Sequence, residues 1–278
     1  MLLTKHRFAL FLSLFVALAT LGAPLAAHAQ RKSPLADAPA IRKRFELRQT
    51  RLELGVGAGS TINQDFYHTV LVDIRGQIHL TDWLSIGGFF DIGAAQVETG
   101  FASKLTGSLS DPTNSMVQRE PTPTGAKNGF QQIPFIAGAQ LGFTPFTGKF
   151  SLFGKLFAAY DFYGFVGPGF INVKPTGGTN VRPCSTAAPA DTSSPDRYVC
   201  GVTGWKIGPT FGVGFHTFFG QGVALAVELR DVMAQLNPSG RDVNGDQVAD
   251  TQDLSWTHTY TLTGSLVVYL PFSAKISP

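Results

Sequence analysis

Residues 69–93 read TVLVDIRGQIHLTDWLSIGGFFDIG, and this stretch decides the fold. Apolar and polar residues alternate along both halves of it, and Thr81-Asp82 separates the two halves. A period of two is typical of a β-strand with one apolar face and one polar face. The stretch therefore predicts two antiparallel strands joined by a tight turn.

The same alternation recurs along the chain and predicts eight strands between residues 45 and 272. The other six are expected over residues 51–58, 133–143, 150–162, 205–216, 223–230 and 257–270. Short connections are expected at 81–82, 144–149 and 220–222, and longer ones at 60–66, 97–130, 165–201 and 235–254. Short and long connections alternate, as in bacterial outer-membrane barrels. The pattern predicts an all-β fold, an eight-stranded antiparallel up-and-down transmembrane β-barrel with short periplasmic turns and long extracellular loops.

The N-terminus has the features of a secretory signal. Lys5 and Arg7 precede an apolar run that ends near Leu21, and Ala27-His28-Ala29 fits a cleavage site. We therefore expect residues 1–29 to be a cleaved signal peptide. Residues 30–44 are basic and without periodicity, which predicts a flexible periplasmic tail, and residues 273–278 are expected to form a C-terminal tail.

Composition supports an exported membrane barrel. Removing residues 1–29 takes away Lys5 and Arg7 and lowers the net charge from +3 to +1, so nucleic acid is not an expected partner. Charged residues make up 15% of the chain, fewer than a soluble β-protein usually carries on its surface. We expect a multi-pass protein of the Gram-negative outer membrane, with outer-membrane lipid and lipopolysaccharide around it.

Charge is confined to one face of the predicted strands. A Lys or Arg facing lipid at the bilayer midplane costs about 2–4 kcal/mol, so the charged face is predicted to line the lumen. Five cations and five carboxylates are expected to pair there and plug the barrel, with lumenal glycines making room for the long cations. The predicted network is Arg51, Glu53, Asp73, Arg75, Asp91, Lys155, Asp161, Lys206, Glu228 and Arg230.

The apolar face is predicted to point outward. On the strand expected at 133–143, Ile133, Phe135 and Leu141 belong to this outward set. Pro134 and Pro209 lie inside predicted strands, where proline usually marks a bulge.

The eight predicted strands, the signal peptide, the polar lumen and the alternation of short and long connections together resemble the OmpA/OmpX-like family. Phe45-Glu46-Leu47 and the turn His79-Leu80-Thr81-Asp82-Trp83-Leu84 are also similar to outer-membrane barrel-domain proteins that are abundant in myxobacteria. The resemblance covers residues 45–272 and implies an eight-stranded membrane barrel. Phe272, rather than the last residue Pro278, is the aromatic candidate for the C-terminal assembly signal, which departs from the family pattern.

Two features fall in predicted long loops. Cys184 and Cys200 are expected to form a disulfide, because an exported chain meets an oxidising compartment. Residues 242–253 space oxygen donors as a calcium loop does, with either a Ca²⁺ site or a solvated acidic loop as the interpretation. The candidate ligands are Asp242, Asn244, Asp246, Val248 through its carbonyl, Asp250 and Asp253.

The sequence favours a structural or interaction protein that presents extracellular loops. The alternatives are a small passive channel and a lipid-modifying enzyme. His258 is predicted to face outward near the long-loop rim, but no carboxylate orienter or G-x-S-x-G motif accompanies it in the sequence, so no enzyme is expected. Envelope-complex proteins are expected partners through the loops or the 30–44 tail.

Overall fold

The computed structural model describes residues 46–109, 123–152, 156–184, 199–219, 222–246, 248–271 and 275–276. The chain divides after Arg44 into two units, and all of these residues belong to the second. The expected signal peptide and the expected 30–44 tail therefore lie outside the described residues.

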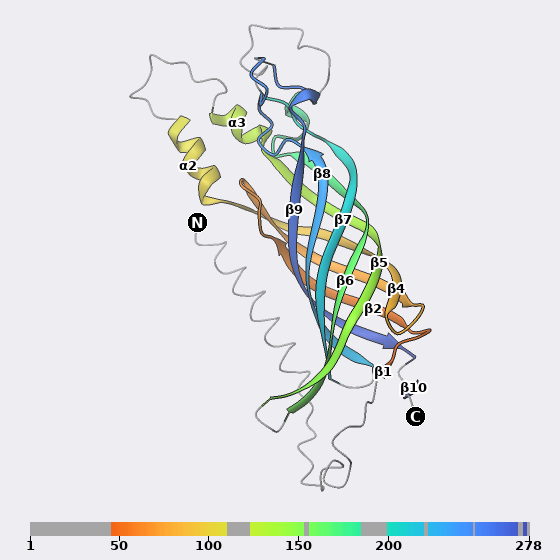
Figure 1. Ribbon diagram of the computed structural model, residues 1–278. Helices are drawn as coiled ribbons and strands as arrows, with labels where there is room; N and C mark the ends of the chain where they lie inside the picture. The colour runs from red at the N-terminus through yellow and green to blue at the C-terminus, as the bar shows by residue number, and fades with distance from the viewer. Residues whose placement is uncertain are drawn as a thin grey trace. The chain divides into compact units, whose positions relative to one another are not determined.

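Eight antiparallel strands follow one another around a closed barrel (Figure 1). They are β2 (Leu52–Thr61), β3 (Tyr67–His79), β4 (Leu84–Glu98), β5 (Gln131–Leu152), β6 (Leu156–Pro175), β7 (Gly204–Phe218), β8 (Val223–Leu236) and β9 (Ser255–Leu270). The barrel closes where β9 pairs with β2, from Leu52 opposite Leu270 to Thr61 opposite Thr261. The predicted eight-stranded up-and-down barrel is confirmed.

A small second sheet joins the ends of the barrel chain. β1 (Glu46–Leu47) pairs with β10 (Lys275–Ile276), which falls within the expected 273–278 tail. β1 directly precedes the start of β2, so both ends of the described chain lie at the rim that carries the turn at residues 80–83. We call this end the short-turn rim and the opposite end the long-loop rim.

The predicted boundaries between the fourth and fifth strands are wrong. The chain does not turn at 144–149. Strand β5 continues to Leu152, and its ladder with β6 runs from Gln131 opposite Pro175 to Leu152 opposite Leu156. Pro145, which lies in the connection expected at 144–149, falls at a shift in register between Phe143 and Phe146 and is absorbed as a bulge. Consequently β6 extends to Pro175, and the long connection begins there rather than at residue 165.

The bulge expected at Pro134 does occur, and it reverses the predicted orientation of Ile133. The register of β5 and β6 shifts between Gln132 and Phe135. An extra residue moves the preceding side chains to the other face of the sheet. Ile133 is therefore 2% exposed inside the barrel, whereas Phe135 faces outward as predicted. Pro209 pairs opposite Pro168 without a register shift, so no bulge forms there.

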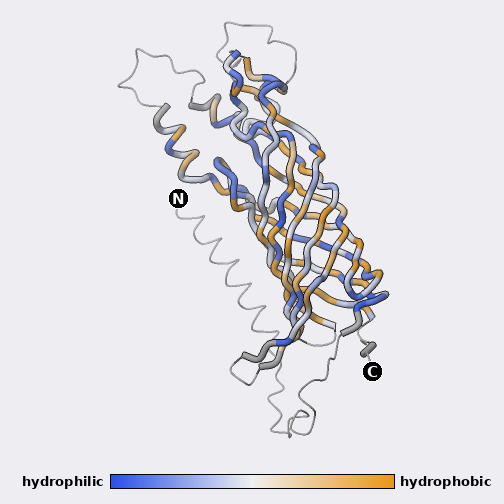
Figure 2. The backbone as a smooth tube through the Cα atoms, viewed as in Figure 1, coloured by the Kyte–Doolittle hydropathy of each residue, from blue (hydrophilic) through white to orange (hydrophobic). Residues whose placement is uncertain are grey.

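Hydrophobic and hydrophilic residues alternate along the barrel strands (Figure 2). The buried interior is layered along the barrel axis. Polar and charged side chains fill the middle and share the short-turn half with a small apolar cluster, and a larger apolar layer fills the half toward the long-loop rim. That apolar layer contains Leu71, Ile133, Ile136, Ile171, Val173, Val202, Val232, Ala234 and Leu236.

The connection between β4 and β5 carries two helices that the strand pattern did not predict. They are α2 (Gly100–Leu109) and α3 (Pro123–Gly129), and a small apolar cluster anchors them to the rim through Phe66, Ala102 and Phe130. Lys127 of α3 lies 2.8 Å from Glu98 Oε2, and this hydrogen bond raises the pKa of the lysine above its usual value. None of the described helices is long and apolar enough to cross a membrane.

Candidate functional site

Arg230 lies at the centre of a buried ionic cluster in the middle of the barrel. Its Nη1 is 2.8 Å from Asp91 Oδ2, and its Nη2 contacts Glu228 Oε1 and lies 3.8 Å from Asp73 Oδ1. The guanidinium also stacks over the Phe89 ring, 3.4 Å from the ring centroid. One arginine therefore holds carboxylates from β3, β4 and β8 together.

Arg75 completes this cluster from the opposite wall. Its Nη1 lies 2.8 Å from Glu228 Oε2, and its Nη2 lies 2.9 Å from Asp73 Oδ2. It also donates to the hydroxyls of Thr263 and Ser265 on β9, each at 3.1 Å. We call Asp73, Arg75, Asp91, Glu228 and Arg230 the central cluster.

A second group of charges lies nearer the short-turn rim. Glu53 Oε2 is 2.9 Å from His79 Nε2, and Glu53 Oε1 is 3.5 Å from His216 Nε2. On the far side of His216, its Nδ1 lies 2.9 Å from Asp161, which also pairs with Arg48. We call Arg48, Glu53, His79, Asp161 and His216 the short-turn cluster.

Tyr163 links the two clusters. Its hydroxyl donates to Glu228 Oε2 at 2.8 Å, and its ring stacks on His216 with 4.5 Å between centroids. The ring needs space on the neighbouring strand, because a Cβ at Gly214 would lie 2.1 Å from Tyr163 Cζ. Glycine here makes room for an aromatic ring, whereas at Gly55 it makes room for Arg75 as predicted.

The structure buries eight of the ten residues of the predicted charge network inside the barrel. Arg51 donates to the carbonyl of Pro271 and lies over the Tyr269 ring. Lys206, near the long-loop rim, is only partly buried and takes part in none of the ion pairs of the described residues. Lys155 lies outside the described residues.

The predicted charge network left out Arg48 and Tyr163, and it left out His79 and His216, which the sequence predicts only as hydrogen-bonding groups of the lumen or rim. Their positions in the sequence could have placed three of them inside. His79, Tyr163 and His216 are each an even number of residues from a charged residue of the same strand, so they face the same side of the sheet. Arg48 carries none, because it precedes the alternating segment and is held by a backbone contact with Asp82 Oδ1 at 2.8 Å.

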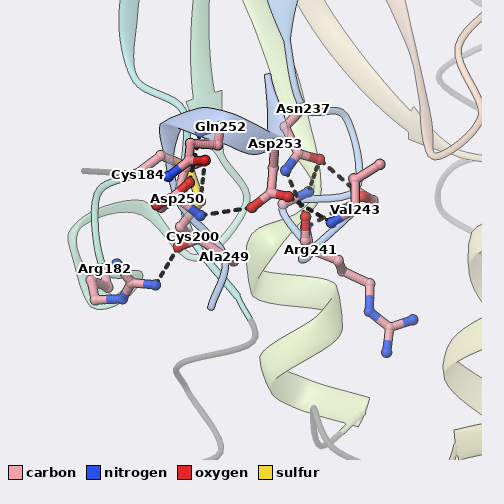
Figure 3. Close-up of a disulfide and its surroundings, with 12 residues drawn as sticks. Arg182, Cys184, Cys200, Asn237, Arg241, Val243, Ala249, Asp250, Gln252 and Asp253 are labelled. Carbon is pink, nitrogen blue, oxygen red and sulfur yellow. Dashed lines mark hydrogen bonds between the residues drawn. A yellow bond between two sulfur atoms is a disulfide. The ribbon is translucent and has the colours of Figure 1, made fainter. Parts of the chain in front are cut away.

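At the long-loop rim, the predicted disulfide between Cys184 and Cys200 is present (Figure 3). It ties two chain segments to the turn after β8, since the Cys200 amide donates to Gly240 O at 2.7 Å and Val199 bridges Arg241. Arg182 Nη2 also donates a hydrogen bond to Ala249 O at 2.5 Å. The disulfide therefore joins two segments of the β6–β7 connection, and these hydrogen bonds fasten that connection to the β8–β9 connection.

The acidic loop is organised by hydrogen bonds to its own backbone. Asp253 is buried and accepts from the amides of Val243, Asn244 and Asp250 at 2.7, 3.0 and 2.8 Å. Asp242, Asn244, Asp246 and Asp250 each accept from an amide two or three residues further along. Among the described residues, no three His, Cys, Asp or Glu side chains group closely enough to hold a metal ion. Calcium binding stays a prediction.

The outward face of the barrel carries exposed apolar side chains on all eight strands. They include Val56, 56% exposed, and Ile207, 64% exposed, together with leucine, isoleucine or phenylalanine on the remaining strands. By contrast, Glu53, Asp73, Asp91 and Asp161 are fully buried. The described barrel is thus apolar on its outer face and holds its charged side chains inside, the reverse of a barrel that is solvated on its outer face.

No family model and no curated protein matches the sequence. Among solved structures, the chain is similar to the N-terminal β-barrel domain of Pseudomonas aeruginosa OprF, with 7% identity and a TM-score of 0.40 over 80% of this chain and 98% of that one. It is also similar to the outer membrane protein OprG from Pseudomonas aeruginosa, with 8% identity and a TM-score of 0.38 over 80% and 97% of the two chains.

Proposed function

We propose that the chain is an outer-membrane β-barrel with a filled interior, which anchors and presents the loops of its long-loop rim. The observation that carries this proposal is the apolar outer wall around an ionic core. In water, each half-exposed Leu, Ile, Val or Phe of that wall forfeits roughly 1 kcal/mol of burial free energy, and lipid removes that cost. Within the part of the chain that the structure describes, the single ring of strands leaves no other element to cover the wall.

The height of the apolar wall fits a bilayer. On β9 it runs from Tyr260 to Leu270, ten residue steps that span about 33 Å along the strand. A strand tilt of about 40° reduces this to about 25 Å, the usual height of the apolar band of such barrels. Trp83 lies beyond the wall at the short-turn rim and Trp256 at the long-loop rim, where interfacial aromatic residues are found.

The packed interior favours an anchor over the alternative of a passive channel. The central cluster, the short-turn cluster and the apolar layer are all buried, and an eight-stranded barrel is only wide enough for its own side chains. A lipid-modifying enzyme is less favoured, because no described serine, threonine or cysteine side chain hydrogen-bonds to His258. We infer that envelope components contact the long-loop rim, and the likeness to myxobacterial barrel-domain proteins stays a prediction.

Epitope tags test both localisation and orientation. A tag inserted after Thr179, an exposed residue of the β6–β7 connection, is expected to bind antibody on intact Gram-negative cells. A matched tag after Lys149, exposed on the β5–β6 hairpin at the short-turn rim, is expected to bind only after the outer membrane is opened. Equal labelling of both tags on intact cells, or recovery of the protein in the soluble periplasmic fraction, would contradict the proposal.

A further inference from the structure

One acidic residue breaks the pattern of the outer wall. On β8, Arg230 and Val232 point into the barrel, so Asp231 between them points outward, in line with the exposed Val227 and Leu229. Its cross-strand neighbours are Phe211 on β7 and Tyr260 on β9. The side chain is nevertheless only 4% exposed, and its Oδ1 has no hydrogen-bond partner. A carboxylate on a lipid-facing wall is costly, and such residues usually have a function.

The partner of Asp231 is His258 on the next strand. Asp231 Oδ2 lies 2.6 Å from His258 Nδ1. Asp231 is therefore a carboxylate that orients this histidine, and the sequence analysis did not identify it. The imidazole stacks on Tyr260, with 5.8 Å between centroids, and Asn63 bonds to the backbone of both residues. The histidine side chain is 44% exposed, and no described residue bonds to its Nε2. The ring is thus fixed on one side and open on the other.

The pair lies at the edge of the apolar wall. Toward the short-turn rim, β9 continues outward with Leu262 and Leu266, and toward the long-loop rim the next outward residue is Trp256. Amphipathic aromatic residues mark the level of lipid headgroups. The polar groups here that can donate outward are the imidazole when both of its nitrogens carry protons, the Trp256 indole and the Tyr260 hydroxyl, whereas the Asp231 carboxylate is covered. A ligand at this place must offer acceptor oxygens outward and apolar chains along the wall.

We propose that His258, held by Asp231, binds the phosphate of an outer-leaflet lipid headgroup through Nε2. With Nδ1 directed at Asp231, a doubly protonated ring presents Nε2–H to a phosphate oxygen as a charged donor. The acyl chains of the same lipid would lie along Leu229, Leu262 and Leu266. This inference rests on the proposed membrane location.

Lipid binding to the full chain in detergent, measured by native mass spectrometry, tests the site. Phosphatidylglycerol is compared with diacylglycerol of the same acyl chains. The wild type is expected to bind the phosphate lipid about tenfold more tightly, the factor that one charge-assisted hydrogen bond supplies. His258→Gln and Asp231→Asn are expected to lose this preference. The control is His68→Gln, an outward histidine on β3 whose Nδ1 faces Thr61 O rather than an acid, and it should keep the preference.

Two further measurements separate the possible failures. Insertion of the wild type into lipid vesicles is measured first, and a chain that does not insert overturns the proposed function. An inserted wild type without preference for the phosphate lipid, or a folded His258→Gln variant that retains it, overturns the headgroup site alone. Displacement of the lipid by inorganic phosphate in excess would show a free-phosphate site and would also overturn it.

Discussion

Replacing Arg230 by Met should destabilise the barrel mainly through one residue, Asp91. Two of the carboxylates around Arg230 retain other partners in this variant. Glu228 still contacts Arg75 and Tyr163, and Asp73 still contacts Arg75 and Ser265. Asp91 loses its cation, because its Oδ2 pairs with Arg230 and neither Arg75 nor another described cation forms an ion pair with it. Asp91 also lies directly opposite Asp73 in the β3–β4 ladder, so removing the cation leaves two facing carboxylates.

The magnitude follows from this orphaned charge. Removing one partner of a buried ion pair costs about 3–5 kcal/mol, so Arg230→Met should lower the free energy of unfolding by that amount. Asp91→Asn alone should cost about 1 kcal/mol or less, because the amide oxygen can still accept from Arg230 and no charge is left unpaired. The double variant should lose only about 1–2 kcal/mol, since Met refills the space beside Phe89 and no isolated carboxylate remains. The coupling free energy is then about 2–4 kcal/mol in magnitude.

Urea unfolding of the chain folded into lipid vesicles measures these differences. Trp83, Trp205 and Trp256 all lie on the exposed outer face, so their fluorescence reports insertion without touching the central cluster. Equal slopes of the four unfolding curves are required for the comparison. Strict additivity of the two substitutions would refute the reasoning, because it would mean that Arg230 does not act by neutralising Asp91.

Three other predictions concern the interior and the rim. In planar bilayers at neutral pH, the wild type should show no stable open level, and a persistent conductance would contradict the filled interior. Replacing both Cys184 and Cys200 by Ala should remove about 3 kcal/mol of loop-closure stabilisation and speed proteolysis of the 176–203 connection, followed by mass spectrometry, while vesicle insertion is unchanged. If the 242–253 loop binds calcium, calorimetry should detect heat for the wild type that Asp246→Ala abolishes; an unchanged response in that variant would leave the loop as an acidic turn held by Asp253.

Residues with a strict period of two could be placed from the sequence. Asp73 and Arg75 on β3, and Glu228 and Arg230 on β8, share a face because alternate side chains of a strand must do so. The acid–histidine pair on the outer wall could not be found this way. Asp231 and His258 are 27 residues apart, and only the register of β8 against β9 brings them together.

The sequence by itself determined the number of strands, the closed barrel and the side of each regular strand that faces inward, because the period-two pattern and the alternating connections allow little else. Tertiary structure decided the rest. The bulge at Pro134 turned Ile133 inward, and the bulge at Pro145 let β5 continue to Leu152 before the turn. A strand can absorb one extra residue as a bulge at a place where the local sequence suggests that the strand ends. Which carboxylate Arg230 neutralises, and which acid orients His258, depends on cross-strand register, and register is set by closure of the whole barrel rather than by any one segment.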